Sequence, residues 1–125
     1  MHFTKLVPNV FYTDIRSGLK IFVECLEFSI GHDELHTDHP FCVVDKDGLR
    51  VNLFQNKEFA EKDNPEFRLV TNEIEEVYKK VESKYPELLH PNLNKITLRP
   101  WGAKEFAMLD VMSGGRLVAG FPVGT

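Results

Sequence analysis

The 125-residue chain carries 15 lysines and arginines against 19 aspartates and glutamates, which gives a formal net charge of −4. The basic residues are scattered, so we expect no nucleic-acid partner. No apolar run approaches the roughly 20 residues that span a bilayer, so we expect no membrane partner. The first residues lack the basic-then-apolar order of a signal peptide, and Cys25 and Cys42 show no CxxC spacing. We therefore expect one domain over residues 1–125, located in the cytoplasm.

The first half of the chain predicts a strand, a helix and three further strands. Asp14 is a typical helix N-cap, and Gly18 inside the helix costs about 1 kcal/mol relative to alanine. Asp47-Gly48 is a hairpin signal. The apolar residues of one helix face are Leu19, Phe22, Val23 and Leu26. The expected strands are Leu6–Tyr12, Phe28–Leu35, Pro40–Val44 and Arg50–Gln55.

The last of these strands alternates between two kinds of side chain. Val51 and Leu53 point to one face, whereas Asn52 and Phe54 point to the other. A shift of one residue in register would exchange the two faces. We expect Asn52 and Phe54 to face inward, toward a ligand.

The second half of the chain repeats this order. A polar linker over Asn56–Pro65 leads to a short strand, Phe67–Val70, and then to a helix capped by Asn72. Pro100 and Gly102 mark a turn that carries Trp101, the single tryptophan, at its tip. The buried residues of the helix are Ile74, Val77, Tyr78 and Val81. A loop over Tyr85–Asn94 precedes strands at Ile96–Arg99 and Glu105–Asp110, and a last strand follows a Gly-rich turn at 113–115.

Short motifs recur in the same order in the two halves, which indicates an internal repeat. Thr13-Asp14 ahead of the first helix parallels Thr71-Asn72 ahead of the second. We predict an α+β fold of two βαβββ modules, at about residues 4–56 and 65–122. Each helix covers one face of its sheet. The free faces curl as one mixed sheet around a cleft, which is the natural place for a ligand.

These motifs also resemble those of a known superfamily. Asn9–Asp14 followed by a helix resembles the opening of the vicinal-oxygen-chelate superfamily, and Arg99–Gly102 with Glu105–Phe106 resembles its C-terminal signature. The superfamily includes the glyoxalase I, bleomycin-resistance and extradiol-dioxygenase families, and the resemblance covers nearly the whole chain. One departure is Glu27, where relatives usually have a glycine that favours positive φ after the helix.

The resemblance implies where a metal ion would be held. Metal-dependent members take four ligands, typically His and Glu, from strands 1, 4, 5 and 8. The matching positions here fall on Val7, Asn52, Glu66, and Val118 or Ala119. Valine and alanine have no lone pair to offer, and one acid with one carboxamide cannot supply three protein ligands. We therefore expect no metal and no other cofactor; the alternative is a divalent ion such as Zn, Ni, Mn or Fe held by other residues.

What remains resembles the bleomycin-resistance branch, whose members bind a drug without altering it and act as homodimers. The resemblance implies a homodimer here, and phenyl and indole rings would stack a flat aromatic or cationic small molecule. Glu66 either faces the cleft as a lone carboxylate or lies exposed at a strand start. The candidate ligand-binding residues are Asn9, Phe11, Phe41, Asn52, Phe54, Glu66, Arg99 and Trp101, and we name no catalytic residue.

Three functions are compatible with these residues. The first is a metal-free binding protein that sequesters a toxic or antibiotic compound. The second is a metal-dependent lyase, isomerase or dioxygenase of the same superfamily. The third is a degenerate module that only dimerises or regulates a partner. A run of histidines and acids over His32–His39 offers metal-binding side chains, but its spacing implies no zinc geometry, and a solvated hairpin loop is the simpler interpretation.

Overall fold

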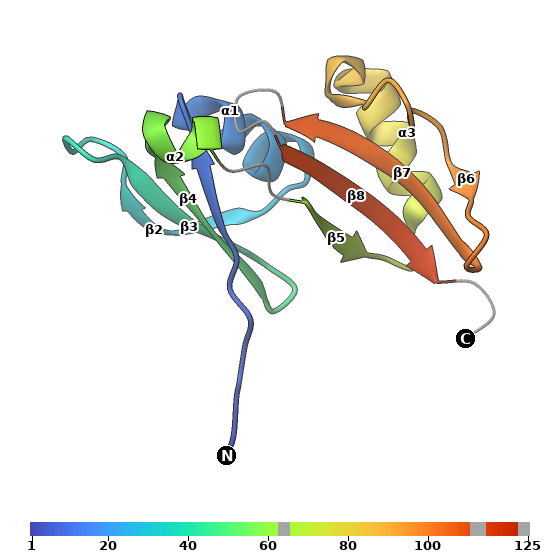
Figure 1. Ribbon diagram of the computed structural model, residues 1–125, viewed down its shortest axis with the longest axis horizontal. Coiled ribbons are helices and arrows are strands. Elements are labelled where there is room, and N and C mark those ends of the chain that lie inside the picture. The colour runs from blue at the N-terminus through green and yellow to red at the C-terminus, as the bar shows by residue number, and fades with distance from the viewer. Residues whose placement is uncertain (63–65, 111–114, 123–125) are drawn as a thin grey trace. The chain divides into compact units, whose positions relative to one another are not determined.

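The computed structural model describes residues 1–62, 66–110 and 115–122, with side chains at 1–62 and 68–108. The chain forms two compact units, residues 1–63 and 64–125. Each unit contains one four-stranded sheet together with helices (Figure 1). The α+β prediction is therefore confirmed. Within the described residues, no helix combines the length and the apolar character that a membrane crossing requires.

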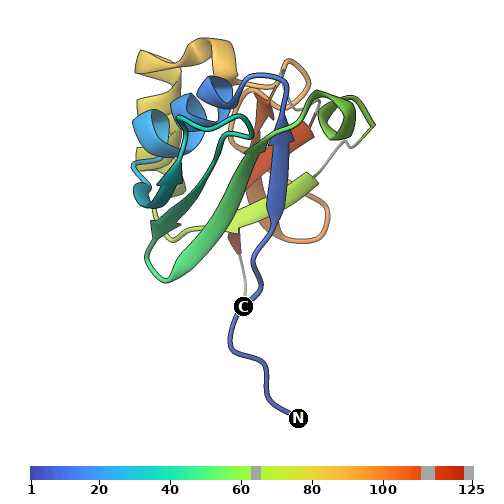
Figure 2. The ribbon, with the colours of Figure 1, turned by 90° about the vertical axis from the view of Figure 1, so that its left-hand side faces the viewer.

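In the first unit, a parallel pair of strands lies at one edge of an otherwise antiparallel sheet. The strand order is β1-β4-β3-β2, with β1 parallel to β4, and the other neighbours are antiparallel. Figure 2 shows these strands side by side. The strands are β1 Asn9–Tyr12, β2 Ser29–Glu34, β3 Phe41–Lys46 and β4 Leu49–Gln55, and the helices are α1 Ile15–Leu19, a π-helix Lys20–Cys25 and α2 Lys57–Lys62.

One face of this sheet forms the core of the first unit. Along β4, Val51 and Leu53 are buried whereas Asn52 and Phe54 are half-buried, as the alternation predicts. The neighbouring strands and the helices complete the core with Val10, Tyr12, Ile15, Ile21, Phe22, Cys25, Cys42 and Val44. The opposite face of the sheet carries the side chains that are only partly covered.

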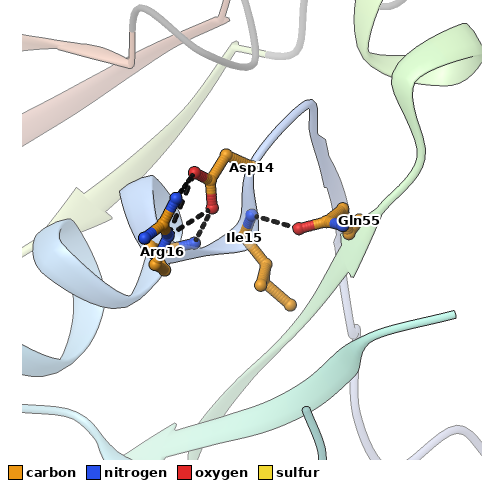
Figure 3. Close-up of polar contacts among 4 residues, drawn as sticks. All are labelled: Asp14, Ile15, Arg16 and Gln55. Carbon is orange, nitrogen blue, oxygen red and sulfur yellow. Dashed lines mark hydrogen bonds and ion pairs between the residues drawn. The ribbon is translucent and has the colours of Figure 1, made fainter. Parts of the chain in front are cut away.

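The first helix begins where the sequence predicts. The Oδ1 atom of Asp14 accepts the Arg16 N–H at 3.0 Å, and the Arg16 guanidinium donates to both carboxylate oxygens (Figure 3). These hydrogen bonds from Arg16 hold the pKa of Asp14 below its usual value. The Ile15 N–H donates to Gln55 Oε1 at 3.0 Å, which fastens the first helical turn to β4.

The helix then widens, and its buried face shifts. In the π-helix the Leu26 N–H reaches back five residues to the Ile21 carbonyl at 2.9 Å. The predicted helix face is therefore wrong in part, because it assumed the α-helical period throughout. Phe22 is buried as predicted, Ile21 and Cys25 are buried in addition, and the half-buried residues are Leu19, Val23 and Leu26.

Glu27 follows this helix in a left-handed conformation, with φ of +63°, at the position where the family resemblance leads one to expect glycine. A side chain there costs about 1–2 kcal/mol. We expect Glu27→Gly to raise the free energy of unfolding by about 1 kcal/mol, because glycine's greater unfolded freedom offsets part of the gain. Urea unfolding measures this change. The control Glu24→Gly, inside the helix, should lose about 1 kcal/mol, and a similar loss in both variants would contradict the expectation.

The first strand is shorter than predicted. It begins at Asn9 rather than Leu6, because Pro8 has no N–H to donate to the ladder. The Pro8 carbonyl still accepts the Asn52 N–H at 2.9 Å. Residues 1–8 run away from the sheet as an N-terminal arm without secondary structure (Figures 1 and 2).

Part of the predicted polar linker is helical. Helix α2 covers Lys57–Lys62, and Asn56 caps it by accepting the Phe59 N–H on Oδ1 at 3.0 Å. The prediction of a linker over Asn56–Pro65 is therefore wrong for these residues. The sequence contains the N-cap residue Asn56, but the polar composition of the segment favoured a linker over a short helix.

The second unit repeats the arrangement of the first. Its strand order is β5-β8-β7-β6, with β5 parallel to β8 and the other neighbours antiparallel. The predicted βαβββ order is therefore confirmed in each unit, while one domain over residues 1–125 stays a prediction. The elements are β5 Glu66–Val70, α3 Ile74–Lys84, a 3₁₀-helix Pro86–Leu88, β6 Thr97–Leu98, β7 Ala103–Asp110 and β8 Gly115–Pro122.

Helix α3 packs on one face of the second sheet. Its Ile74 and Val81 side chains are fully buried, and the Tyr78 ring meets Phe106 of β7 edge to face, with centroids 5.0 Å apart. The predicted helix face is therefore confirmed for Ile74 and Val81, whereas Val77 and Tyr78 are half-buried. Residues between α3 and β6 also join the sheet, because Leu89 forms a bridge with Met108.

The start of α3 differs by one residue from the prediction. Glu73, not Asn72, occupies the N-cap position, and it forms no side-chain cap. Instead, the Glu73 N–H donates to Thr71 Oγ1 at 3.0 Å. The Thr71-Asn72 motif thus marks the helix start, but the threonine rather than the asparagine accepts the hydrogen bond.

Candidate ligand-binding site

Three phenylalanines form a continuous row across the first sheet, on the face opposite the core. Phe11 of β1 pairs with Phe54 of β4, which pairs with Phe41 of β3. The centroids of Phe11 and Phe54 are 5.4 Å apart and those of Phe54 and Phe41 are 5.5 Å apart, with nearly parallel rings. All three rings are half-buried. This aromatic row therefore leaves part of each of the three residues exposed, where an aromatic or cationic group can contact the rings.

Two further rings extend the aromatic row, and the sequence analysis missed both as site residues. Phe59 of α2 meets Phe11 edge to face at 5.1 Å, and His32 of β2 lies 5.5 Å from Phe41. Phe59 is half exposed, so α2 adds an aromatic wall beside β1. The Asn56 cap could have revealed this helix, whereas the contact of His32 with Phe41 depends on a β-bulge at residues 30–32 that the sequence does not announce.

An amide pair lies beside the aromatic row. Asn9 and Asn52 face each other across β1 and β4, and the Asn52 side-chain amide donates to Asn9 Oδ1 at 2.9 Å. This bond orients both side chains and does not use the Asn9 NH₂ group or the Asn52 carbonyl oxygen. The two predicted amides therefore lie together, one strand step away from the rings, where they can orient a guest.

An ion pair and a histidine–carboxylate hydrogen bond flank the aromatic row. Arg50 donates to Asp45 through Nε at 2.7 Å, and this bond holds the pKa of Asp45 below its usual value. His32 and Glu34 approach to 2.8 Å at the other side of the sheet. The Arg50–Asp45 pair satisfies its own charge in solvent, so it lies beside the aromatic row without supplying a free charge to it.

The other predicted aromatic residue lies in the second unit, on the turn between β6 and β7. The Gly102 N–H donates to the Arg99 carbonyl at 3.0 Å, and the Arg99 N–H donates to the Ala103 carbonyl at 2.7 Å. Gly102 has φ of +87°, which fits a three-residue hairpin loop ending in glycine. Trp101 lies at the tip, as predicted, and is exposed, and the Arg99 guanidinium carbon lies 4.7 Å from its ring centroid.

Near this turn, β7 carries a buried acid that the sequence analysis did not name as a site residue. Glu105 is only 2% exposed. Its Oε1 accepts from Arg68 Nε at 3.2 Å, and its Oε2 lies 3.9 Å from Arg99 Nε. The sequence did hold one signal of this pair, because Glu105 directly precedes the apolar run from Phe106 to Met108. A glutamate in a buried strand needs a cation nearby.

Solved structures share the fold of this chain. A bleomycin-binding protein in complex with bleomycin matches with a TM-score of 0.68 at 20% identity, over 95% of this chain and 98% of that chain. The bleomycin-binding protein of bleomycin-producing Streptomyces verticillus, in complex with copper(II)-bleomycin, matches at 0.68 with 17% identity, over 100% and 99%. A glyoxalase/bleomycin resistance protein/dioxygenase from Nocardioides matches at 0.72 with 12% identity, over 99% and 86%.

The chain has the glyoxalase/bleomycin resistance fold. At these low identities the structural likeness establishes the fold, which confirms the architecture expected from the sequence motifs. No family model matches the sequence, and no curated protein matches it either.

A divalent first-row metal ion prefers imidazole or carboxylate ligands, and of the four positions matched by the sequence resemblance only Glu66 carries one. Asn52 offers only a carboxamide, which is bonded to Asn9, and Val7 precedes β1. The side chains of Val118 and Ala119 lie outside the described part, but neither residue type has a donor atom. Among the described residues, no three His, Cys, Asp or Glu side chains gather closely enough to hold an ion.

Glu66 is the remaining candidate from the sequence. It is the first residue of β5 and pairs through its backbone with Arg116 of β8. Its side chain lies outside the described part of the structure, so whether it faces a ligand stays a prediction. The structure thus groups Asn9, Phe11, Phe41, Asn52 and Phe54 in the first unit, and Arg99 with Trp101 in the second.

Proposed function

We propose that this protein binds a small molecule with a planar aromatic or cationic group and sequesters it without chemical change. The observation that carries the proposal is the aromatic row: the rings of Phe11, Phe54 and Phe41 lie in contact and are only partly covered. A flat guest would gain by stacking on these faces, and a cation by attraction to their π electrons. The Asn9–Asn52 pair would orient it through the amide groups that remain.

Two further observations support this proposal. Proteins solved in complex with bleomycin and with copper(II)-bleomycin have the same fold, so the fold is suited to holding an antibiotic. The net charge of −4 favours a cationic guest. We therefore propose an antibiotic or toxic compound of this kind as the natural ligand.

We also propose that the protein uses no resident metal or other cofactor. The donor atoms support this, because the ligand positions implied by the superfamily resemblance carry only one acid, Glu66, and one carboxamide, Asn52, beside valine or alanine. The metal-dependent lyase, isomerase or dioxygenase alternative would need three protein ligands, and the described side chains supply no such set.

A homodimer is the proposed assembly. The N-terminal arm exposes Met1, Phe3 and Leu6 almost completely, and exposed apolar side chains in one segment favour a protein partner. We expect light scattering of the full chain to give about twice the 14.4 kDa mass of one chain. Replacing Phe3 and Leu6 together with serine should shift the protein toward the monomer, whereas a monomeric wild-type protein would contradict the proposal.

The proposed location is the cytoplasm. Cys25 and Cys42 are buried and lie outside any disulfide, which suits a reducing compartment. Burial raises the pKa of the Cys42 thiol to about 11, so this thiol stays protonated and unreactive at neutral pH. Cell fractionation tests the proposed location.

Calorimetric titration of the full chain with bleomycin, and with the planar aromatic cation proflavine, tests the proposed function. We expect saturable binding of at least one of them, and mass spectrometry should recover the bound compound unchanged. Absence of binding by both compounds at millimolar concentration would contradict the proposal. Conversion of the compound by purified protein would contradict sequestration and favour the enzyme alternative.

A further inference from the structure

Glu105 carries the one buried charged side chain among the residues whose burial is described. Its two carboxylate oxygens differ in their hydrogen bonding. Oε1 accepts a hydrogen bond from Arg68 Nε at 3.2 Å. Oε2 is fully covered and accepts no hydrogen bond. A buried carboxylate normally accepts hydrogen bonds at both oxygens, so Oε2 can still accept one from a bound ligand.

Arg99 lies close to this oxygen but too far away to donate a hydrogen bond to it. Its Nε is 3.9 Å from Glu105 Oε2, beyond the 2.7–2.9 Å or so of a charge-assisted hydrogen bond. The Arg99 Nε is itself buried without an acceptor. The backbone of Arg99 closes the hairpin through its bonds with Ala103 and Gly102, which limits how far the side chain can advance toward Glu105.

The same guanidinium also rests on an aromatic face. The central guanidinium carbon of Arg99 lies 4.7 Å from the centroid of the Trp101 ring. A carboxylate and an indole that both lie close to one guanidinium are a combination that recognises planar cations. The Trp101 side is open, since this residue is 60% exposed, and the Arg99 side chain is 31% exposed. Outward rotation of Arg99 would therefore uncover Glu105 Oε2.

We propose that Glu105 and Trp101 form a binding site for a guanidinium or amidinium group, which Arg99 of the same chain fills in the free protein. A guest cation, free of the hairpin, reaches the full hydrogen-bond distance to Oε2 while it stacks on the indole. Arg99 then turns outward into solvent. This site gives Arg99 the role of an internal competitor, in place of the ligand-binding role expected from the sequence.

Benzamidine is the probe, with benzamide and benzoate as neutral and anionic compounds of the same shape. The readout is the indole N–H of Trp101 in nitrogen-15 NMR spectra of the full chain, where it gives a single side-chain signal of its kind. We expect benzamidine to shift this signal saturably, and benzamide and benzoate to do so at least tenfold more weakly.

Two variants should change benzamidine affinity in opposite directions. Arg99→Ala removes the competitor and should raise the affinity about tenfold, whereas Glu105→Gln removes the charge partner and should lower it about tenfold. Glu75→Gln is the matched control, because it removes the same charge from an exposed position on α3, and it should leave the affinity within twofold.

The opposite signs keep the test decisive. Weaker or unchanged binding in Arg99→Ala would overturn the proposal, and so would equal shifts from benzamidine and benzamide. If Glu105→Gln does not fold, the increase expected for Arg99→Ala alone decides the question. Because Trp101 and Glu105 belong to the second unit, a negative result leaves the proposal for the aromatic row untouched.

Discussion

Replacing Gly18 with alanine is expected to lower the free energy of unfolding by about 2 kcal/mol, as overpacking of a filled core typically does. A Cβ atom on Gly18 would lie 2.5 Å from Cε2 and 2.7 Å from Cζ of Tyr12. The Tyr12 ring is stiff and fully buried, so it cannot turn aside into solvent. Helix propensity alone would favour alanine by about 1 kcal/mol, but the clash outweighs this gain.

Urea unfolding of three variants checks this prediction. Ser17→Ala, at the neighbouring half-buried position, controls for helix propensity and should be neutral or slightly stabilising. Tyr12→Leu removes the opposing ring, so the cost of Gly18→Ala should shrink in that background by about 1 kcal/mol or more. A gain in stability for Gly18→Ala in the wild-type chain would show that the helix can move away from β1.

Local rules predicted the strands well. In β4 the alternation of Val51, Asn52, Leu53 and Phe54 places its residues on the correct faces, because successive strand side chains always point in opposite directions. The hairpin loop with Pro100 and Gly102 is also predicted, since glycine there meets a requirement for positive φ. These features depend on neighbours in the sequence, so the sequence alone suffices for them.

The errors arise where tertiary contacts decide the structure. The close approach of Gly18 to Tyr12 and the widening of the helix into a π-helix depend on how the helix sits on the sheet. Helix α2 has an N-cap that the sequence contains. The contact of its Phe59 with Phe11, however, joins residues that are far apart in the chain. Periodicity in one segment carries no information about such contacts.

The candidate site, too, could be predicted only in part from the sequence. Alternation puts Phe11, Phe41 and Phe54 on half-buried faces, but only the strand register brings their rings into contact. The environment of Glu105 is even harder to predict from the sequence, because Arg68, which donates a hydrogen bond to it, lies 37 residues away in the chain. The sequence could therefore suggest which residues bind a ligand, but not that a buried acid lies near the Trp101 turn.

The strongest test of the aromatic row is its central ring. Phe54 contacts Phe11 on one side and Phe41 on the other, so its loss interrupts the π surface in the middle. We expect Phe54→Leu to weaken binding of bleomycin or proflavine about tenfold, equivalent to about 1.4 kcal/mol. Leucine fills a similar volume, so the stability of the sheet should change by less than about 1.5 kcal/mol.

Two matched variants separate the aromatic surface from simple bulk. Phe54→Tyr keeps the ring and should bind within about twofold of the wild-type protein, because the π face is retained. Phe3→Leu removes a ring from the N-terminal arm, outside the aromatic row, and should leave the affinity unchanged. Equal binding by Phe54→Leu and the wild-type protein would show that the guest does not stack on this row. Equal losses in the leucine and tyrosine variants would instead point to shape at position 54, since both would alter the packing but only one removes the ring.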